Sequence, residues 1–188
     1  MVAGKSHVQG FMSQKDVQVT LLCDPDMNFL KERQKEFKEK YTKEVALEQD
    51  LRRVMDNKDV DVISLATPNH WHALATIWAC QAGKDVYVEK PGSHNLAEGR
   101  KMDEAANKYD RIVQHGVQLR SSPAVQQAVQ LMGDGYIGNV YMARGLVFRM
   151  RGDIGEKGVS PVPEGLDYDL RAGPAPKPPF THNLLHYN

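Results

Sequence analysis

Short apolar runs alternate with helix-forming segments over the first 132 residues, and this alternation constrains the fold more than any other feature of the sequence. The apolar runs predict strands at 17–22, 45–46, 60–66, 86–88 and 111–113. The segments between and after them predict helices at 27–41, 51–55, 70–82, 95–108 and 123–132. Strands that alternate with helices are joined by right-handed crossovers. The sequence therefore predicts an α/β fold with a doubly wound parallel sheet, and the unbroken run at 60–66 predicts a strand buried on both faces.

The charge balance excludes some partners. Twenty-four Lys and Arg residues match 24 Asp and Glu residues, so the formal net charge is zero and no long-range field favours nucleic acid or an acidic membrane surface. No segment reaches transmembrane length and no signal peptide is visible. A cytoplasmic location is the default expectation, with export to the periplasm if a signal precedes the chain. Cys23 and Cys80 are far apart and are expected to be buried, reduced thiols.

The character of the chain changes after Gly133. Residues 139–148 form a strand-like run with no helix after it, and residues 152–188 are rich in Gly and Pro. We therefore expect residues 1–120 to form one domain. Residues 121–188 are expected to begin a second, α+β open-sheet domain that stops before it is complete.

Polar residues follow two of the predicted strands at the point where each strand ends. Thr67, Pro68, Asn69 and His72 follow the run at 60–66, and the next strand ends in Glu89-Lys90-Pro91. Parallel strands present their carboxyl ends to one crevice, where ligands bind. The two strand ends therefore predict one wall of an active site.

With these motifs the chain resembles the Gfo/Idh/MocA family of nicotinamide-dependent oxidoreductases. The segment Thr67-Pro68-Asn69-x-x-His72, the tripeptide Glu89-Lys90-Pro91 and the strand-ending Asp24 follow the order and spacing of the family. The resemblance extends from about Gly4 to Asn188 and implies an NAD(P)-binding Rossmann-like domain before a substrate domain. It also implies hydride transfer between NAD(P) and a hydroxyl of a sugar or polyol, and a homo-oligomer for the full-length form.

The resemblance also implies roles for individual residues. Lys90 would be the catalytic residue, beside the nicotinamide and the reacting hydroxyl, where a lysine can take part in proton transfer. Asp24 would accept the ribose hydroxyls and repel a 2′-phosphate, so NAD is expected rather than NADP. Pro91 is expected in a cis peptide bond. The remaining cofactor-binding candidates are Gly4, Thr67, Pro68, Asn69, His72, Glu89 and Gln118.

The chain departs from the family pattern at both ends. Gly4 occupies the place of the third glycine of the G-x-G-x-x-G turn, so the first strand and two phosphate-approaching glycines are missing. In the usual order that strand lies beside 17–22, which would be left without one neighbour. The histidine that is catalytic in the family would lie beyond Asn188. The chain therefore looks truncated at both ends, and its activity is expected to be impaired.

Two alternatives to this enzyme remain open. One is an NAD-requiring glycosidase on the same scaffold, and the other is a non-catalytic remnant. No metal site is expected. His70 and His72 point in different directions on a helix, and the pair His182 and His186 has neither a predicted helix nor a nearby carboxylate.

Overall fold

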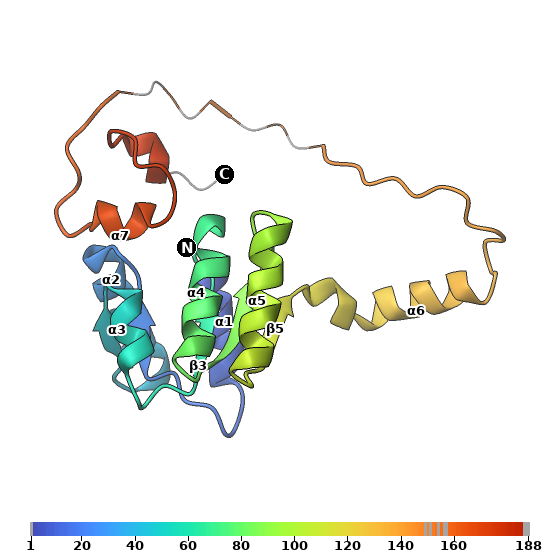
Figure 1. Cartoon of the computed structure of the whole chain (residues 1–188), viewed down its shortest axis with the longest axis horizontal. Helices are drawn as coiled ribbons and strands as arrows, with labels where there is room; N and C mark the ends of the chain where they lie inside the picture. The colour runs from blue at the N-terminus through green and yellow to red at the C-terminus, as the bar shows by residue number, and fades with distance from the viewer. Residues whose placement is uncertain (1, 149, 151, 154, 156–157, 186–188) are drawn as a thin grey trace.

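The computed structural model describes residues 2–148, 150, 152, 153, 155 and 158–185, and His186 of the histidine pair lies outside them. The molecule has an α/β body from which a long arm departs and returns (Figure 1). The strands are β1 (Leu21–Cys23), β2 (Ala46–Glu48), β3 (Val62–Leu65), β4 (Asp85–Glu89) and β5 (Val113–Gly116). The α-helices are α1 (Val2–Met12), α2 (Met27–Tyr41), α3 (Leu51–Asp56), α4 (Asn69–Gln81), α5 (Leu96–Lys108), α6 (Pro123–Gly133) and α7 (Tyr168–Ala172). Short 3₁₀ turns cover Gln118–Ser121 and His182–Leu185.

Local sequence signals explain where the longest helix begins and ends. The Asp26 carboxylate accepts the backbone N–H groups of Asn28 and Phe29, which caps the start of α2. At the other end Thr42 adopts a left-handed conformation and its N–H donates to Lys38 O. The bounds of α2 are those that the sequence predicts.

The strands form two separate parallel sheets. One contains β1 and β2, with Leu21 opposite Ala46, and the other has the order β3–β4–β5, with Val62 opposite Asp85. No strand among the described residues joins β1 to β3. This arrangement confirms a Rossmann-like, doubly wound sheet that lacks its first strand, because the break falls where that strand would lie.

The prediction that the 60–66 strand is buried on both faces was wrong. Ile63 and Leu65 are buried, but Val62, which points to the other face of β3, is 53% exposed. A parallel strand is covered on both faces only when a neighbouring strand and its crossover helix complete the layer. Here β3 lies at the edge of its sheet and Val62 lines the cavity beside it, so its side chain is not covered.

The hydrophobic core lies between the three-stranded sheet and helices α4 and α5. Ala75, Ala79 and Cys80 of α4 are fully buried against Val86 and Val88 of β4. Both cysteines are free thiols, but only Cys80 is buried. Cys23 is exposed, contrary to prediction, because β1 borders the open break in the sheet.

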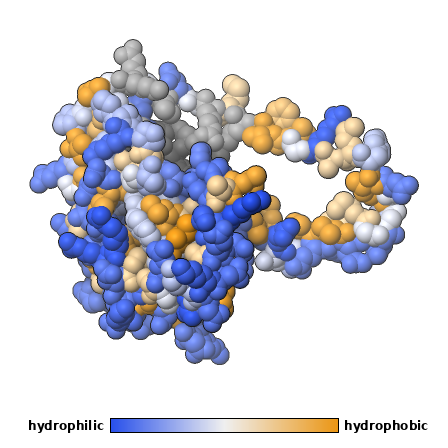
Figure 2. Space-filling model, viewed as in Figure 1, coloured by the Kyte–Doolittle hydropathy of each residue, from blue (hydrophilic) through white to orange (hydrophobic). Residues whose placement is uncertain are grey.

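The prediction of a strand at 139–148 was also wrong. These residues form an extended coil after α6, on the arm that runs away from the body (Figure 1). Its apolar side chains are exposed, with Tyr141 at 92% and Val147 at 93%, and Figure 2 shows apolar surface along this arm. A strand needs a partner, and no described residue supplies one.

Residues 160–180 return to the body and pack beside the start of α2. Leu166 forms an isolated bridge with Asp26, and the N–H of Asp167 donates to Pro25 O at 2.9 Å. Trp71 of α4 donates from Nε1 to Leu170 O at 3.1 Å. The division into domains at residue 120 stays a prediction.

Gly173 is expected to be essential for this packing. Its φ is +50°, and a Cβ there would lie 2.3 Å from Cε2 of Trp71. Replacing it with alanine should therefore cost more than about 1 kcal/mol and undock residues 160–180. Hydrogen exchange would show faster exchange in this segment. Gly158→Ala, where a Cβ meets open space, is the control and should leave exchange unchanged.

Candidate functional site

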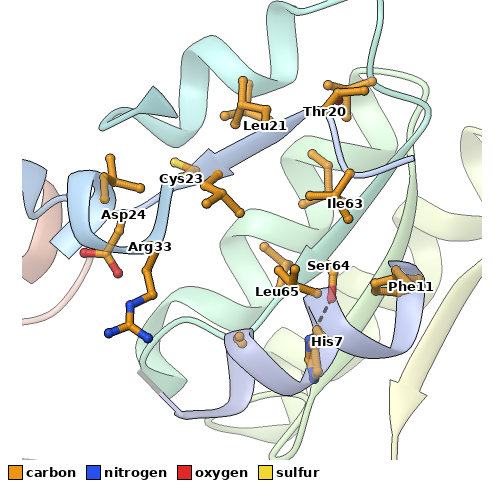
Figure 3. A pocket seen from close by; sticks show the side chains of 18 of the residues that line it. His7, Phe11, Thr20, Leu21, Cys23, Asp24, Arg33, Ile63, Ser64 and Leu65 are labelled. Carbon is orange, nitrogen blue, oxygen red and sulfur yellow. Dashed lines mark hydrogen bonds between the residues drawn. The ribbon is translucent and has the colours of Figure 1, made fainter. Parts of the chain in front are cut away.

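A cavity of about 710 Å³ lies in the break between the two sheets (Figure 3). Strands β1 and β3 form two of its walls, with α1 on one side and α2 and α3 on the other. Four of the predicted cofactor-binding residues line it: Gly4, Asp24, Thr67 and Pro68. Parallel strands end at one edge of the fold, which is why residues so far apart in the sequence meet here.

Asp24 follows β1 directly and lies at one end of the cavity (Figure 3). Its Oδ1 accepts the N–H of Asp26 at 3.0 Å, which fixes the carboxylate in the turn before α2. Burial raises the pKa of Asp24, and the Asp26 hydrogen bond and the Arg171 guanidinium partly offset that rise. The carboxylate is therefore positioned to accept hydrogen bonds from a ligand that enters the cavity.

Thr67 carries an unused polar atom. Its Oγ1 is buried and has no hydrogen-bond partner among the described residues. A buried hydroxyl without a partner is costly, so this atom marks a place where a polar ligand group could bind. Asn69 is the first residue of α4 and Pro68 precedes it, and no side chain caps the start of this helix.

His72 links the two strand ends and is 1% exposed. Its Nδ1 lies 2.6 Å from Pro91 O, and its Nε2 lies 3.0 Å from Thr67 O. Both partners are carbonyl oxygens, and a neutral imidazole can donate to only one of them. His72 therefore holds the loop after β3 against the loop after β4. Contact between His72 and a cofactor stays a prediction.

Glu89 is the centre of a second cluster at the strand ends. Its Oε1 contacts Nε2 of His7 at 3.1 Å and accepts a short hydrogen bond from the amide of Gln118. His7 also contacts Ser64 Oγ through Nδ1 at 2.7 Å (Figure 3). Burial pushes the pKa of Glu89 up, but the hydrogen bonds from His7, from the Lys90 N–H and from Gln118 outweigh it, so the pKa is lowered.

Lys90 follows Glu89 and its side chain is exposed. The peptide bond between Lys90 and Pro91 is cis, as predicted. The backbone of Lys90 thus lies between two fixed neighbours, Glu89 and Pro91, while its side chain is exposed. Lys90 does not line the cavity, and its contact with a cofactor or substrate stays a prediction.

His7 and Ser64 belong to this cluster, although the sequence did not single them out as site residues. His7 lies three residues after Gly4, so both face the sheet from α1, and the Cβ position of Gly4 is 3.9 Å from Cβ of Ala66. Ser64 is a polar residue inside an apolar strand. Both signals were visible in the sequence, but only the packing of α1 on β3 brings these side chains to Glu89.

The residues that line the cavity fit a dinucleotide. A carboxylate at the end of β1 can accept ribose hydroxyls, and the unpartnered Thr67 hydroxyl can bind a second polar group. No cluster of three or more potential metal ligands occurs in the part of the chain that the structure describes. None of the described helices is both long and apolar enough to cross a bilayer.

The chain is similar to known sugar and polyol dehydrogenases. It is 34% identical to levoglucosan dehydrogenase from Pseudarthrobacter phenanthrenivorans over 96 residues, which are 51% of this chain and 25% of the relative. It is 24% identical to D-glucoside 3-dehydrogenase from Escherichia coli over 151 residues, 80% of this chain and 42% of the relative. Its fold is similar to that of myo-inositol 2-dehydrogenase from Lactobacillus plantarum, with a TM-score of 0.63 and 23% identity over 73% of this chain and 40% of the other.

The chain thus spans less than half the length of each of these relatives. The model of the oxidoreductase family with an NAD-binding Rossmann fold matches residues 1–117. That match covers the two sheets, both strand-end motifs and all the residues that line the cavity except Leu170 and Arg171. The chain therefore belongs to the Gfo/Idh/MocA family of oxidoreductases.

Proposed function

We propose that this chain supplies the NAD-binding part of an oxidoreductase that transfers a hydride between NAD and a hydroxyl-bearing carbon of a sugar or polyol. The observation that carries the proposal is the meeting of the Asp24 carboxylate and the unpartnered Thr67 hydroxyl at one cavity between the sheets. The names of the relatives, a levoglucosan dehydrogenase and a glucoside dehydrogenase, support a sugar as the substrate class.

Each predicted site residue has a place in this proposal. Asp24 would accept the ribose hydroxyls, and it favours NAD because a carboxylate repels the 2′-phosphate of NADP. Thr67 and Pro68 would border the diphosphate, near Gly4 in the first turn of α1. Bound NAD would take the hydride. The residues at the strand ends of β3, β4 and β5 would line the nicotinamide end: Asn69, His72, Glu89, Lys90 and Gln118.

Lys90 would handle the proton of the reacting hydroxyl. Its position beside the Glu89 carboxylate, which His7 and Gln118 hold in place, would keep the lysine backbone fixed at the edge of the sheet. A residue that takes a proton must reach the hydroxyl within hydrogen-bond distance, so this role requires a substrate that approaches the exposed side chain of Lys90. The substrate domain and a homo-oligomer are proposed for the full-length protein.

Titration of the chain with NAD tests this proposal. We expect saturable quenching of the fluorescence of Trp71 and Trp78, because Trp71 lines the cavity. Asp24→Ala should weaken NAD binding about 10- to 100-fold, since a hydrogen bond to a charged group contributes about 1.5–3 kcal/mol.

Asp103→Ala is the matched control, because Asp103 is an exposed carboxylate on α5. It should leave NAD affinity unchanged. Absence of NAD binding by a chain that circular dichroism shows to be folded would refute the proposal for this chain. Equal binding by the wild type and by Asp24→Ala would refute the role of Asp24.

A further inference from the structure

We propose that Arg171 is a specificity-determining residue of the cofactor site, where it binds the 2′-phosphate of NADP beside Asp24 and so lowers the preference for NAD. The inference rests on the proposed function and adds one contact to the same nucleotide. Arg171 belongs to residues 160–180, the segment that packs beside the start of α2, and we call it the docked segment. This segment lies outside the range 1–117 that the family model matches.

The docked segment is attached to the turn that follows β1. The N–H of Asp167 donates to Pro25 O at 2.9 Å, and Pro25 comes directly after Asp24. Gln49 joins the two sides, because its Nε2 donates to Pro25 O at 2.9 Å and to Gly165 O at 3.0 Å. The segment is therefore fixed at the residue next to the carboxylate that is proposed to bind ribose.

The same segment is attached to the start of α4, which follows β3. Trp71 donates from Nε1 to Leu170 O at 3.1 Å, and Nε2 of His70 lies 3.1 Å from Arg171 O. The N–H of Arg171 donates to Asp167 O at 3.0 Å. The backbone of Arg171 is thus held between the ends of β1 and β3, at the edge where ligands bind in folds of this type.

Arg171 and Asp24 line the same cavity, together with Leu170, Pro25 and Trp71. Burial raises the pKa of the Asp24 carboxyl, and the Arg171 guanidinium is among the groups that lower it. The two charges are therefore close enough to interact. A ligand group that reaches the Asp24 carboxylate also comes within the field of Arg171.

A guanidinium beside this carboxylate changes what the ribose site can bind. A carboxylate after the second strand of a Rossmann fold accepts the ribose hydroxyls of NAD, whereas a nearby arginine accommodates the 2′-phosphate of NADP. The planar N–H donors of arginine match phosphate oxygens in a bidentate pair. With Asp24 and Arg171 at one site, the preference for NAD depends on the balance of two charges and not on the carboxylate alone.

Two other cations that line the cavity are paired with carboxylates. Nζ of Lys5 lies 3.1 Å from Glu36 Oε2, and Arg33 donates from Nη1 to the same oxygen at 2.7 Å. Nη2 of Arg33 also donates to Glu32 Oε1 at 2.5 Å. Figure 3 shows Arg33 on the same side of the cavity as Asp24. A 2′-phosphate would have to compete with two carboxylates for Arg33, which serves as the comparison for Arg171.

Titrations with NAD and with NADP, followed by the fluorescence of Trp71 and Trp78, test the inference. The wild type should bind both nucleotides, and NAD more tightly. Arg171→Ala should weaken NADP binding about 10- to 100-fold, the effect of losing a hydrogen bond between charged groups. NAD binding should change by less than about threefold, since NAD has no phosphate at this position. The readout is the ratio of the two dissociation constants, because a merely structural loss would weaken both nucleotides equally.

Three further variants identify the cause. Arg171→Lys keeps the charge but not the planar donors, so it should recover part of the NADP affinity. Asp24→Asn removes the repulsion and should bind NADP more tightly than the wild type. Lys177→Ala is the matched control, because Lys177 lies in the docked segment, pairs with Asp169 and does not line the cavity. It should bind both nucleotides like the wild type.

Calorimetry with two smaller probes locates the contact. Adenosine 2′,5′-bisphosphate and adenosine 5′-monophosphate differ only in the 2′-phosphate. Arg171→Ala should weaken binding of the bisphosphate and leave binding of the monophosphate unchanged. Equal affinities of the wild type and Arg171→Ala for the bisphosphate would overturn the inference.

The remaining outcomes separate this inference from the proposed function. Binding of neither nucleotide by a folded chain would refute both. Binding of NAD without binding of NADP would refute only the role of Arg171, as would an equal loss of both nucleotides in Arg171→Ala. A loss of NADP affinity in Arg33→Ala but not in Arg171→Ala would assign the phosphate contact to Arg33 instead.

Discussion

His72→Ala is expected to lower the free energy of unfolding by about 2–5 kcal/mol. His72 is 1% exposed and contacts Thr67 O and Pro91 O. The alanine would leave a cavity and would remove the N–H donor of a carbonyl oxygen, and both effects are costly in a buried position. Urea denaturation followed by circular dichroism measures the change.

Two further variants separate the causes. His72→Phe fills the space but cannot donate a hydrogen bond, so it should recover only the part of the loss that comes from the cavity. His94→Ala removes an exposed histidine and should change the free energy of unfolding by less than about 0.5 kcal/mol. If His72→Ala unfolds at the same urea concentration as the wild type, His72 does not hold the two loops together.

Lys90→Ala is expected to have the largest effect on catalysis. If a full-length protein has the proposed activity on a sugar or polyol, its kcat should fall by about 10²- to 10⁴-fold, the contribution of a positioned proton-transferring group. NAD affinity should change little, because the proposed cofactor contacts at Asp24 and Thr67 are intact. NADH absorbance measures kcat, and fluorescence titration measures the affinity.

Lys101→Ala is the control, since Lys101 is an exposed lysine of α5 paired with Glu104. It should retain full activity. A decrease of less than about threefold in kcat for Lys90→Ala would remove Lys90 from the proton-transfer step. Release of a reducing sugar from a glycoside without net NADH would instead favour the NAD-requiring glycosidase.

The sequence alone determined the order and type of most elements. The apolar face and the Asp26 cap set the bounds of α2, and the strands β3 and β4 follow from their apolar runs. These are local effects: a cap, a helical period or a β-branched run acts within a few residues of itself. The motifs that end β3 and β4 were therefore visible, as was the family to which the chain belongs.

Only the tertiary structure decided which strands have partners. The run at 139–148 has the composition of a strand but forms none, and β3 lies at the edge of its sheet with Val62 exposed. His7 reaches Glu89 across 82 positions because α1 packs on β3, and His72 turns away from solvent to join two loops. Strand pairing and side-chain burial depend on residues distant in sequence, so no local pattern could specify them.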